Sequence, residues 1–207
     1  MKTAQVYKKE PFYDPLLLVN RSHALENPSE TPAGLVDVST FMPVMPGQKV
    51  YLLFPAASAL KALLDHLDAK GVITAVSGWR SFSEQVNIYK DSLIENGEEF
   101  TKKYVAWPGC SEHETGLAID LGLTMENMDF IRPWFPYDGI CETFRNLAPS
   151  YGFILRYAKE KENVTGISHE PWHFRYVGTP HSEIITQKGL CLEEYIENIN
   201  KKNNPQG

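Results

Sequence analysis

The chain has 207 residues, a length that suits one domain rather than two. Hydrophobic residues make up 43% and charged residues 22%, a balance that is typical of globular proteins and excludes a disordered or collagen-like chain. The net charge is -6, so the sequence lacks the basic character with which proteins grip a nucleic-acid backbone. We therefore expect no nucleic-acid partner.

The first 50 residues contain six prolines and few periodic stretches. We expect an irregular segment over 1–50 that wraps the domain, with one short strand at Leu16–Val19. This apolar stretch is too short for a membrane span or a signal-peptide core, which predicts a cytoplasmic protein. The main domain is expected over 51–202, followed by a polar tail at 203–207.

Helical and extended patterns mix along the rest of the chain. We expect helices at 56–70, from 81 onwards, within 98–110, at about 140–150, at 182–188 and at 192–202. We expect strands at 72–77, 117–121, 152–157 and 172–177. This mixture predicts a single α+β domain. Its cysteines, Cys110, Cys141 and Cys191, include no CxxC pair, which favours reduced thiols over disulfides.

Three side chains stand out as a candidate metal set: His113, Asp120 and His173. Asp120 lies inside an apolar run, and a buried carboxylate is costly unless it is paired or bound to a cation. Seven positions separate His113 from Asp120, which would place them on opposite faces of a continuous strand, but Gly116 allows the chain to fold back. Two neutral imidazoles and one carboxylate leave a zinc ion with an open fourth position, as in catalytic sites.

Two further residues have the chemistry of a hydrolase. Glu170 precedes His173 by three residues, and Pro171 can turn it toward the ligand face, where it would take the proton of an attacking water. Arg80 follows the predicted strand 72–77 and would supply a fixed cation, either to a developing oxyanion or to a substrate carboxylate.

Each of these residues also has an ordinary interpretation. A single histidine is more often a surface or core residue, Asp120 can pair with an arginine, Arg80 can stack on Trp79, and Glu170 can be a solvated acid. The pattern Ser-x-His-x-x-Gly-x-Ala-x-Asp at 111–120 changes this balance, because its chance occurrence is far below about one in a thousand.

The segments Ser111–Asp120 and Glu170–His173 resemble the zinc D-Ala-D-Ala peptidases, the VanX, VanY and VanXY group, which shares a fold with the hedgehog signalling domain. The resemblance runs from about Val72 to Tyr195. It is strongest to the VanXY branch, through 77–81, 138–141 and 152–157. Trp79 and Glu114 depart from the residues that are common in the family, tyrosine and glutamine.

The resemblance implies a small antiparallel sheet flanked by helices, and one Zn²⁺ per chain on His113, Asp120 and His173. It also implies Glu170 as general base and Arg80 as the cation that steadies the tetrahedral intermediate. Substrate contacts are implied less directly, at Ser111, Gln85 and Trp172.

The implied reaction removes the terminal D-Ala from peptidoglycan precursors that end in D-Ala-D-Ala. Cleavage of the free dipeptide and a link to glycopeptide (vancomycin) resistance are also implied. Alternatives remain open at this point: an L,D-carboxypeptidase that trims wall tetrapeptides, a hedgehog-like zinc binding module without catalysis, and a globular protein without metal.

Overall fold

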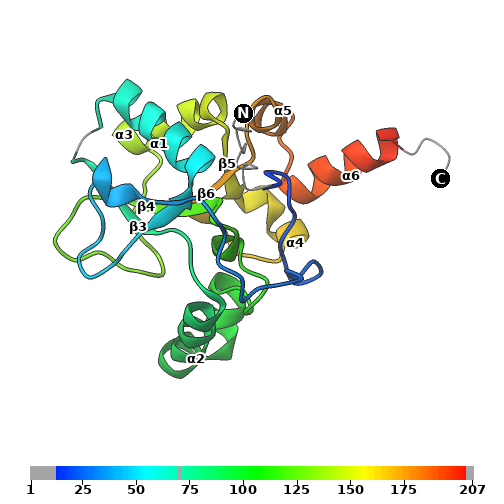
Figure 1. The fold of residues 1–207 in the computed structure, drawn as a ribbon, viewed down its shortest axis with the longest axis horizontal. Coiled ribbons are helices and arrows are strands. Elements are labelled where there is room, and N and C mark those ends of the chain that lie inside the picture. The colour runs from blue at the N-terminus through cyan, green and yellow to red at the C-terminus, as the bar shows by residue number, and fades with distance from the viewer. Residues whose placement is uncertain (1–12, 70, 204–207) are drawn as a thin grey trace, which may run out of the picture.

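Four strands form the central sheet of this computed structural model, which describes residues 13–69 and 71–203 (Figure 1). Neighbouring strands are antiparallel and follow one another in the order β3 (Ile73–Ser77), β4 (Ala118–Leu123), β6 (Glu170–Tyr176) and β5 (Phe153–Tyr157). A second sheet pairs β1 (Leu35–Asp37) with β2 (Tyr51–Leu53). The expected α+β fold with a small antiparallel sheet is confirmed.

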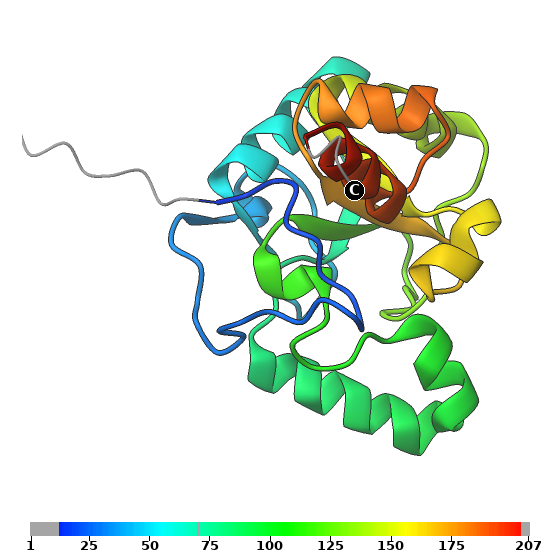
Figure 2. The same cartoon turned by 90° about the vertical axis from the view of Figure 1, so that its right-hand side faces the viewer.

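Helices lie on both sides of the central sheet (Figures 1 and 2). α1 (Phe54–Leu67) and α3 (Gly139–Leu147) pack together on one side, and α2 (Phe82–Tyr104) lies on the other. The other α-helices described are α4 (Glu162–Thr165), α5 (His181–Gln187) and α6 (Leu192–Asn203). Short 3-10 helices occupy Val38–Thr40 (η1), Glu112–Thr115 (η2), Ala148–Tyr151 (η3) and Lys159–Lys161 (η4).

Apolar and polar side chains alternate along the two middle strands, β4 and β6, so that the sheet has one apolar and one polar face at this point. Ile119 and Phe174 are paired across β4 and β6 and are buried in the apolar core with α1 and α3. Their neighbours Asp120 and His173 are also paired with each other. Successive side chains of a strand point to opposite faces, so this polar pair lies on the face away from the apolar core.

Two register shifts interrupt the regular sheet near that polar pair. One lies between Ala75 and Ser77 of β3, opposite Asp120. The other lies opposite the start of β6, where Leu155 pairs with Phe174 but Tyr157 pairs with Glu170. Such irregularities re-aim side chains locally and are frequent beside active sites.

The helix predicted from Ser81 begins there with a capping box. The Glu84 N–H donates to Ser81 Oγ at 3.3 Å, and the Ser81 N–H donates to the Glu84 carboxylate at 2.7 Å. The short helix predicted within 98–110 is confirmed: non-helical backbone at Gly97 separates the last part of α2, which ends at Tyr104, from the long helix before it. Gly97 has a φ of 79°, a conformation that glycine adopts without steric cost.

The strand predicted at Leu16–Val19 is wrong. Pro15 and Leu16 form a turn, and Leu17 donates its N–H to the Asp14 carbonyl at 3.1 Å, because an Asp-Pro sequence favours a turn over an extended ladder. Residues 13–50 contain β1 and η1 but are otherwise irregular. Of the predicted wrap and tail, residues 1–12 and 204–207 lie outside the described residues.

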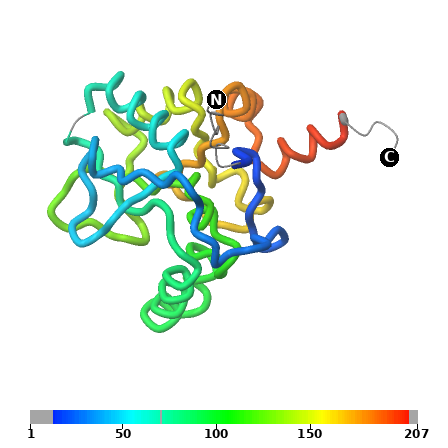
Figure 3. The backbone as a smooth tube through the Cα atoms, in the orientation of Figure 1, coloured from blue at the N-terminus to red at the C-terminus, as the bar shows by residue number. Residues whose placement is uncertain are grey.

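The N-terminal segment runs past the start of α6 (Figure 3). Asn20 donates to Glu193 of α6 at 3.2 Å, which ties this segment to the C-terminal helix. A second apolar cluster, which includes Ile154, Val177, Ile185 and Leu192, packs β5 against α5 and α6. Over the described residues, none of the helices combines the length and the apolar character needed to span a membrane.

Candidate metal centre and active site

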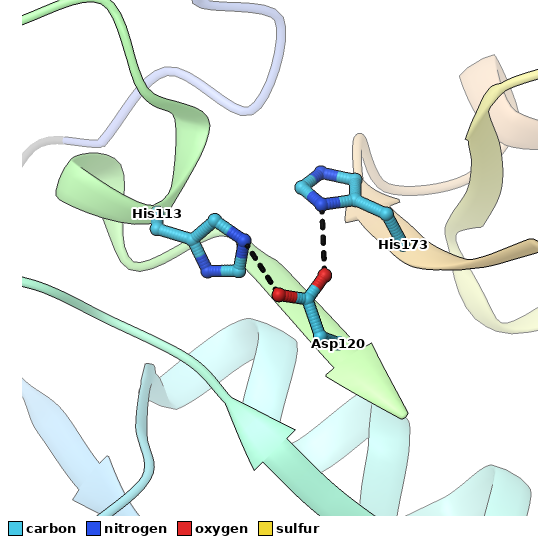
Figure 4. A group of neighbouring side chains, drawn as sticks. All are labelled: His113, Asp120 and His173. Carbon is cyan, nitrogen blue, oxygen red and sulfur yellow. Dashed lines mark hydrogen bonds and ion pairs between the residues drawn. The ribbon is translucent and has the colours of Figure 1, made fainter. Parts of the chain in front are cut away.

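Three side chains from three different elements converge in the interior (Figure 4). His113 comes from η2, Asp120 from β4 and His173 from β6, and all three are buried. His113 Nε2 lies 3.1 Å from Asp120 Oδ2, and His173 Nδ1 lies 3.0 Å from Asp120 Oδ1. One ligand atom from each residue lies within 4.8 Å of the others. The structure thus brings together the three residues that the sequence predicts as a metal set.

His113 reaches this position because the chain reverses directly after it. Gly116 ends η2 with a φ of 73°, the left-handed conformation that glycine adopts readily. The His113 ring donates from Nδ1 to the Gly78 carbonyl at 2.8 Å, which leaves Nε2 facing Asp120. The charged segment around His113 is a buried 3-10 helix, because its charged side chains find partners inside the protein.

His173 is oriented from the opposite side by a carboxylate that the sequence analysis missed. Its Nε2 lies 3.4 Å from Oε2 of Glu112, so Nδ1 faces Asp120. Oε1 of Glu112 accepts from Arg156 and from Arg175, each at 2.8 Å. Burial by itself would raise the pKa of Glu112, but these two guanidinium groups hold it well below its ordinary range.

The arrangement fits a transition-metal ion such as zinc. Each imidazole commits one nitrogen to a protein partner and turns the other toward the same carboxylate, which is how metal-binding histidines are held. Burial lowers the pKa of His113 to about 4, helped by the nearby Arg80 cation. Burial also disfavours the charged form of His173, but Asp120 and Glu112 overcome it and raise its pKa to about 9. A metal ion would therefore displace a proton from His173 but not from His113.

Glu170 stands at the edge of this metal set. Its Oε2 lies 3.8 Å from His173 Nδ1, although two strand residues three positions apart would ordinarily face opposite ways. The register shift between β5 and β6 falls between these residues and brings both to one side. From the sequence, Pro171 alone was expected to turn Glu170 toward the ligands. Burial raises the pKa of Glu170 to about 8, and the negative charge of Asp120 adds to the effect.

Arg80 follows β3 and is fixed by three side chains. Its guanidinium donates to Ser77 Oγ at 2.9 Å, to Gln85 Oε1 at 3.1 Å and to Asp120 Oδ2 at 3.2 Å. Gln85 is fully buried and donates in turn to the Ala106 carbonyl at 2.8 Å. Both ends of the Gln85 amide are therefore engaged inside the protein, and its evident task is to position Arg80. A substrate contact by Gln85 stays a prediction.

A cavity of about 40 Å³ opens onto these residues. Ser111 and Trp172 line it, together with Arg80, Glu170 and the metal set. Glu112 also lines it, and the rest of its wall is largely apolar. The apolar residues come from α2 and the residues after it, from the loop before α3, from the end of β5 and from the segment after α4: Ile88, Tyr104, Val105, Ala106, Phe130, Ile131, Tyr157 and Ile167. A small polar centre with an apolar wall suits a small, partly apolar substrate end.

Several residues at the site escaped the sequence analysis. Tyr157 lines the cavity with its ring 4.8 Å from that of His173. Glu112, Arg156 and Arg175 are fully buried and paired. The available signal was an arginine inside each of the two predicted strands 152–157 and 172–177, since a buried charge requires a partner.

Comparison with known proteins places the chain among peptidases of one type. Residues 49–179 match the family model of VanY, D-alanyl-D-alanine carboxypeptidase. The bifunctional D-Ala-D-Ala dipeptidase and carboxypeptidase VanXYC of Enterococcus gallinarum is 42% identical over 87% of this chain and 92% of the relative.

Among the solved structures that are similar to this one are three peptidases. The vancomycin-resistance D,D-dipeptidase VanXYg, in complex with a D-Ala-D-Ala phosphinate analogue, is 51% identical with a TM-score of 0.84, over 90% of this chain and 71% of the other. The LD-carboxypeptidase LdcB is 36% identical with a TM-score of 0.73, over 87% and 84%. The D,D-pentapeptidase VanY of a VanB-type cassette, in complex with Zn(II), is 28% identical with a TM-score of 0.67, over 88% and 98%.

Proposed function

The chain belongs to the VanY family of D-alanyl-D-alanine carboxypeptidases, and we propose that it is a zinc-dependent D,D-peptidase. It would remove the terminal D-Ala from peptidoglycan precursors that end in D-Ala-D-Ala and would also cleave the free dipeptide. The observation that carries this proposal is the convergence of His113, Asp120 and His173 beside Glu170 and Arg80 at one cavity. One zinc ion would bind to each chain.

Each polar side chain at the cavity has a distinct task in this reaction. His113, Asp120 and His173 would hold Zn²⁺, which when bound supplies a Lewis acid that polarises a carbonyl and lowers the pKa of water. Glu170 accepts the proton of the attacking water and returns it to the leaving amine. Arg80 neutralises the negative charge that develops on the carbonyl oxygen, and Ser77 and Gln85 keep it in place.

The cavity wall supports a short substrate end with small apolar groups. Trp172 and Ser111 lie beside the metal set, where they would contact the terminal D-Ala and its carboxylate. An apolar wall favours a methyl group and excludes bulk water, which strengthens the interaction between Arg80 and the developing charge. The similarity to VanXYC and VanXYg supports glycopeptide resistance as the biological setting.

The similarity to LdcB favours one alternative, an L,D-carboxypeptidase that acts on trimmed wall tetrapeptides. The same zinc set and the same base would serve that reaction. The two functions differ in the configuration of the residue before the scissile bond. Inverting that centre would point its side chain in a different direction relative to the apolar wall.

Comparison of three substrates tests the proposal directly. The zinc-loaded chain should cleave a D,D-ended pentapeptide and a D,D-dipeptide, and it should cleave an L,D-ended tetrapeptide far more slowly. A depsipeptide that ends in D-Ala-D-lactate should also be cut at least about tenfold more slowly, since a lost buried hydrogen bond costs roughly 1–3 kcal/mol. Equal kcat/KM on the pentapeptide and the tetrapeptide would instead establish the L,D alternative, and no hydrolysis would indicate a binding module.

A further inference from the structure

We propose that Glu112, held by Arg156 and Arg175, is a positioning residue for the metal centre that fixes the ring of His173. Glu112 is among the residues around the cavity, but its side chain has no exposed surface and contacts the ring of His173, through which it would act on the metal. The inference rests on the proposed function only in taking His173 as a zinc ligand.

The contacts of Glu112 divide its two oxygens between two tasks. Oε1 accepts from Arg156 Nε and from Arg175 Nη1, and the three side chains have no exposed surface. Oε2 is left to face His173 Nε2 at 3.4 Å. The two arginines therefore hold the carboxylate in a single orientation, and that orientation points one oxygen at the ligand ring.

The ion-pair network around Glu112 includes a second carboxylate, which balances the charge of the two arginines. Arg156 also donates to both oxygens of Glu193 on α6, at 2.9 and 2.6 Å. Arg175 donates to the carbonyls of Pro15 and Leu17, at 3.2 and 2.8 Å. Two cations thus meet two carboxylates, and both terminal segments of the described chain are tied to the base of the metal centre.

Stability alone does not account for such a network. Burial of an ion pair costs so much desolvation free energy that apolar residues of similar volume often stabilise a fold equally well. Orientation of a ligand is a task that apolar residues cannot perform, because the imidazole of His173 needs an acceptor to fix its tautomer. The backbone carbonyl of Gly78 serves His113 in this way, whereas the Nε2 of His173 meets a side chain.

The test is zinc affinity, measured by competition with a chromogenic chelator. Glu112→Gln should weaken zinc binding about 10–100-fold, as the loss of such outer partners typically does. Glu114→Gln is the matched control: it lies on the same 3-10 helix, is also buried, and accepts from the Gly109 and Ser111 backbone instead. It should leave zinc affinity within a few-fold of the wild type.

Two measurements separate positioning from a structural role. In metal-loaded protein labelled with ¹⁵N-histidine, NMR should show His173 binding the metal through Nδ1 with its proton on Nε2 in the wild type. In Glu112→Gln it should show exchange between two ring orientations, which bind through Nδ1 or through Nε2. The charge-balanced variant Glu112→Gln/Arg175→Gln should lose the same zinc affinity as Glu112→Gln, even where urea unfolding of the metal-free protein shows that its stability has recovered.

The proposal is overturned if Glu112→Gln lowers the stability of the metal-free protein but binds zinc like the wild type. It is also overturned if Glu114→Gln loses as much zinc affinity, or if the double variant regains it. A wild-type chain that binds no zinc would refute the proposed function instead, so the two failures are distinguishable.

Discussion

Replacement of Glu170 by Gln separates its role as a base from that of a metal ligand. Glu170 Oε2 lies 3.8 Å from His173 Nδ1, and the residue is not part of the converging set of His113, Asp120 and His173. Gln has nearly the same shape as Glu but cannot accept a proton at neutral pH. Glu170→Gln should therefore keep the zinc and lose turnover by about 10²–10⁴-fold, the usual contribution of a general base.

The same substitution should change the stability of the metal-free protein in a pH-dependent way. The pKa of Glu170 rises from 4.5 to about 8 in the folded state, chiefly through burial. Between these values the folded protein binds more protons than the unfolded one, so its stability falls as pH rises. Gln carries no such penalty. The free energy of unfolding of Glu170→Gln should therefore exceed that of the wild type by an amount that grows across this interval. The difference should reach the order of 5 kcal/mol above pH 8, at about 1.4 kcal/mol per pKa unit.

Three assays decide the matter: zinc content after gel filtration, peptide release, and urea unfolding in a chelator at pH 5 and pH 9. We expect Glu170→Gln to match the wild type in zinc, to fail in turnover, and to be the more stable protein at pH 9. Loss of zinc from Glu170→Gln would make Glu170 a ligand. A stability difference that does not change with pH would refute the argument from burial.

Two further predictions concern Arg80 and the metal ligands. Arg80→Ala should lower kcat more than it raises KM, because the cation acts on the charge that develops in the transition state. Arg80→Lys should recover only part of the activity, since a single ammonium group cannot reach Ser77, Gln85 and Asp120 together. A change confined to KM would assign Arg80 to the substrate carboxylate. His113→Ala should lose both zinc and activity, and the wild type should hold one zinc per chain by elemental analysis, so an active, metal-free chain would exclude a zinc mechanism.

Most of the secondary structure and the metal set could be predicted from local patterns. The leucines of α1, the Ser81 capping box and the alternation of β6 are statements about neighbouring residues, and the structure confirms them. The strand predicted at Leu16–Val19 failed because the Asp14-Pro15 pair before it favours a turn, and Leu17 donates its N–H back to the Asp14 carbonyl.

The sequence by itself determined which residue types are available for chemistry: two histidines, an aspartate inside an apolar run, a glutamate near the second histidine and an arginine after a strand. Only the tertiary structure decided how they are aimed. The register of β4 against β6 places Asp120 opposite His173, and a shift in the next pair turns Glu170 to the same side. Each histidine is held by a residue that is distant from it in sequence: His113 by Gly78 and His173 by Glu112. Hydrogen bonds across such distances depend on packing, which no local spacing records.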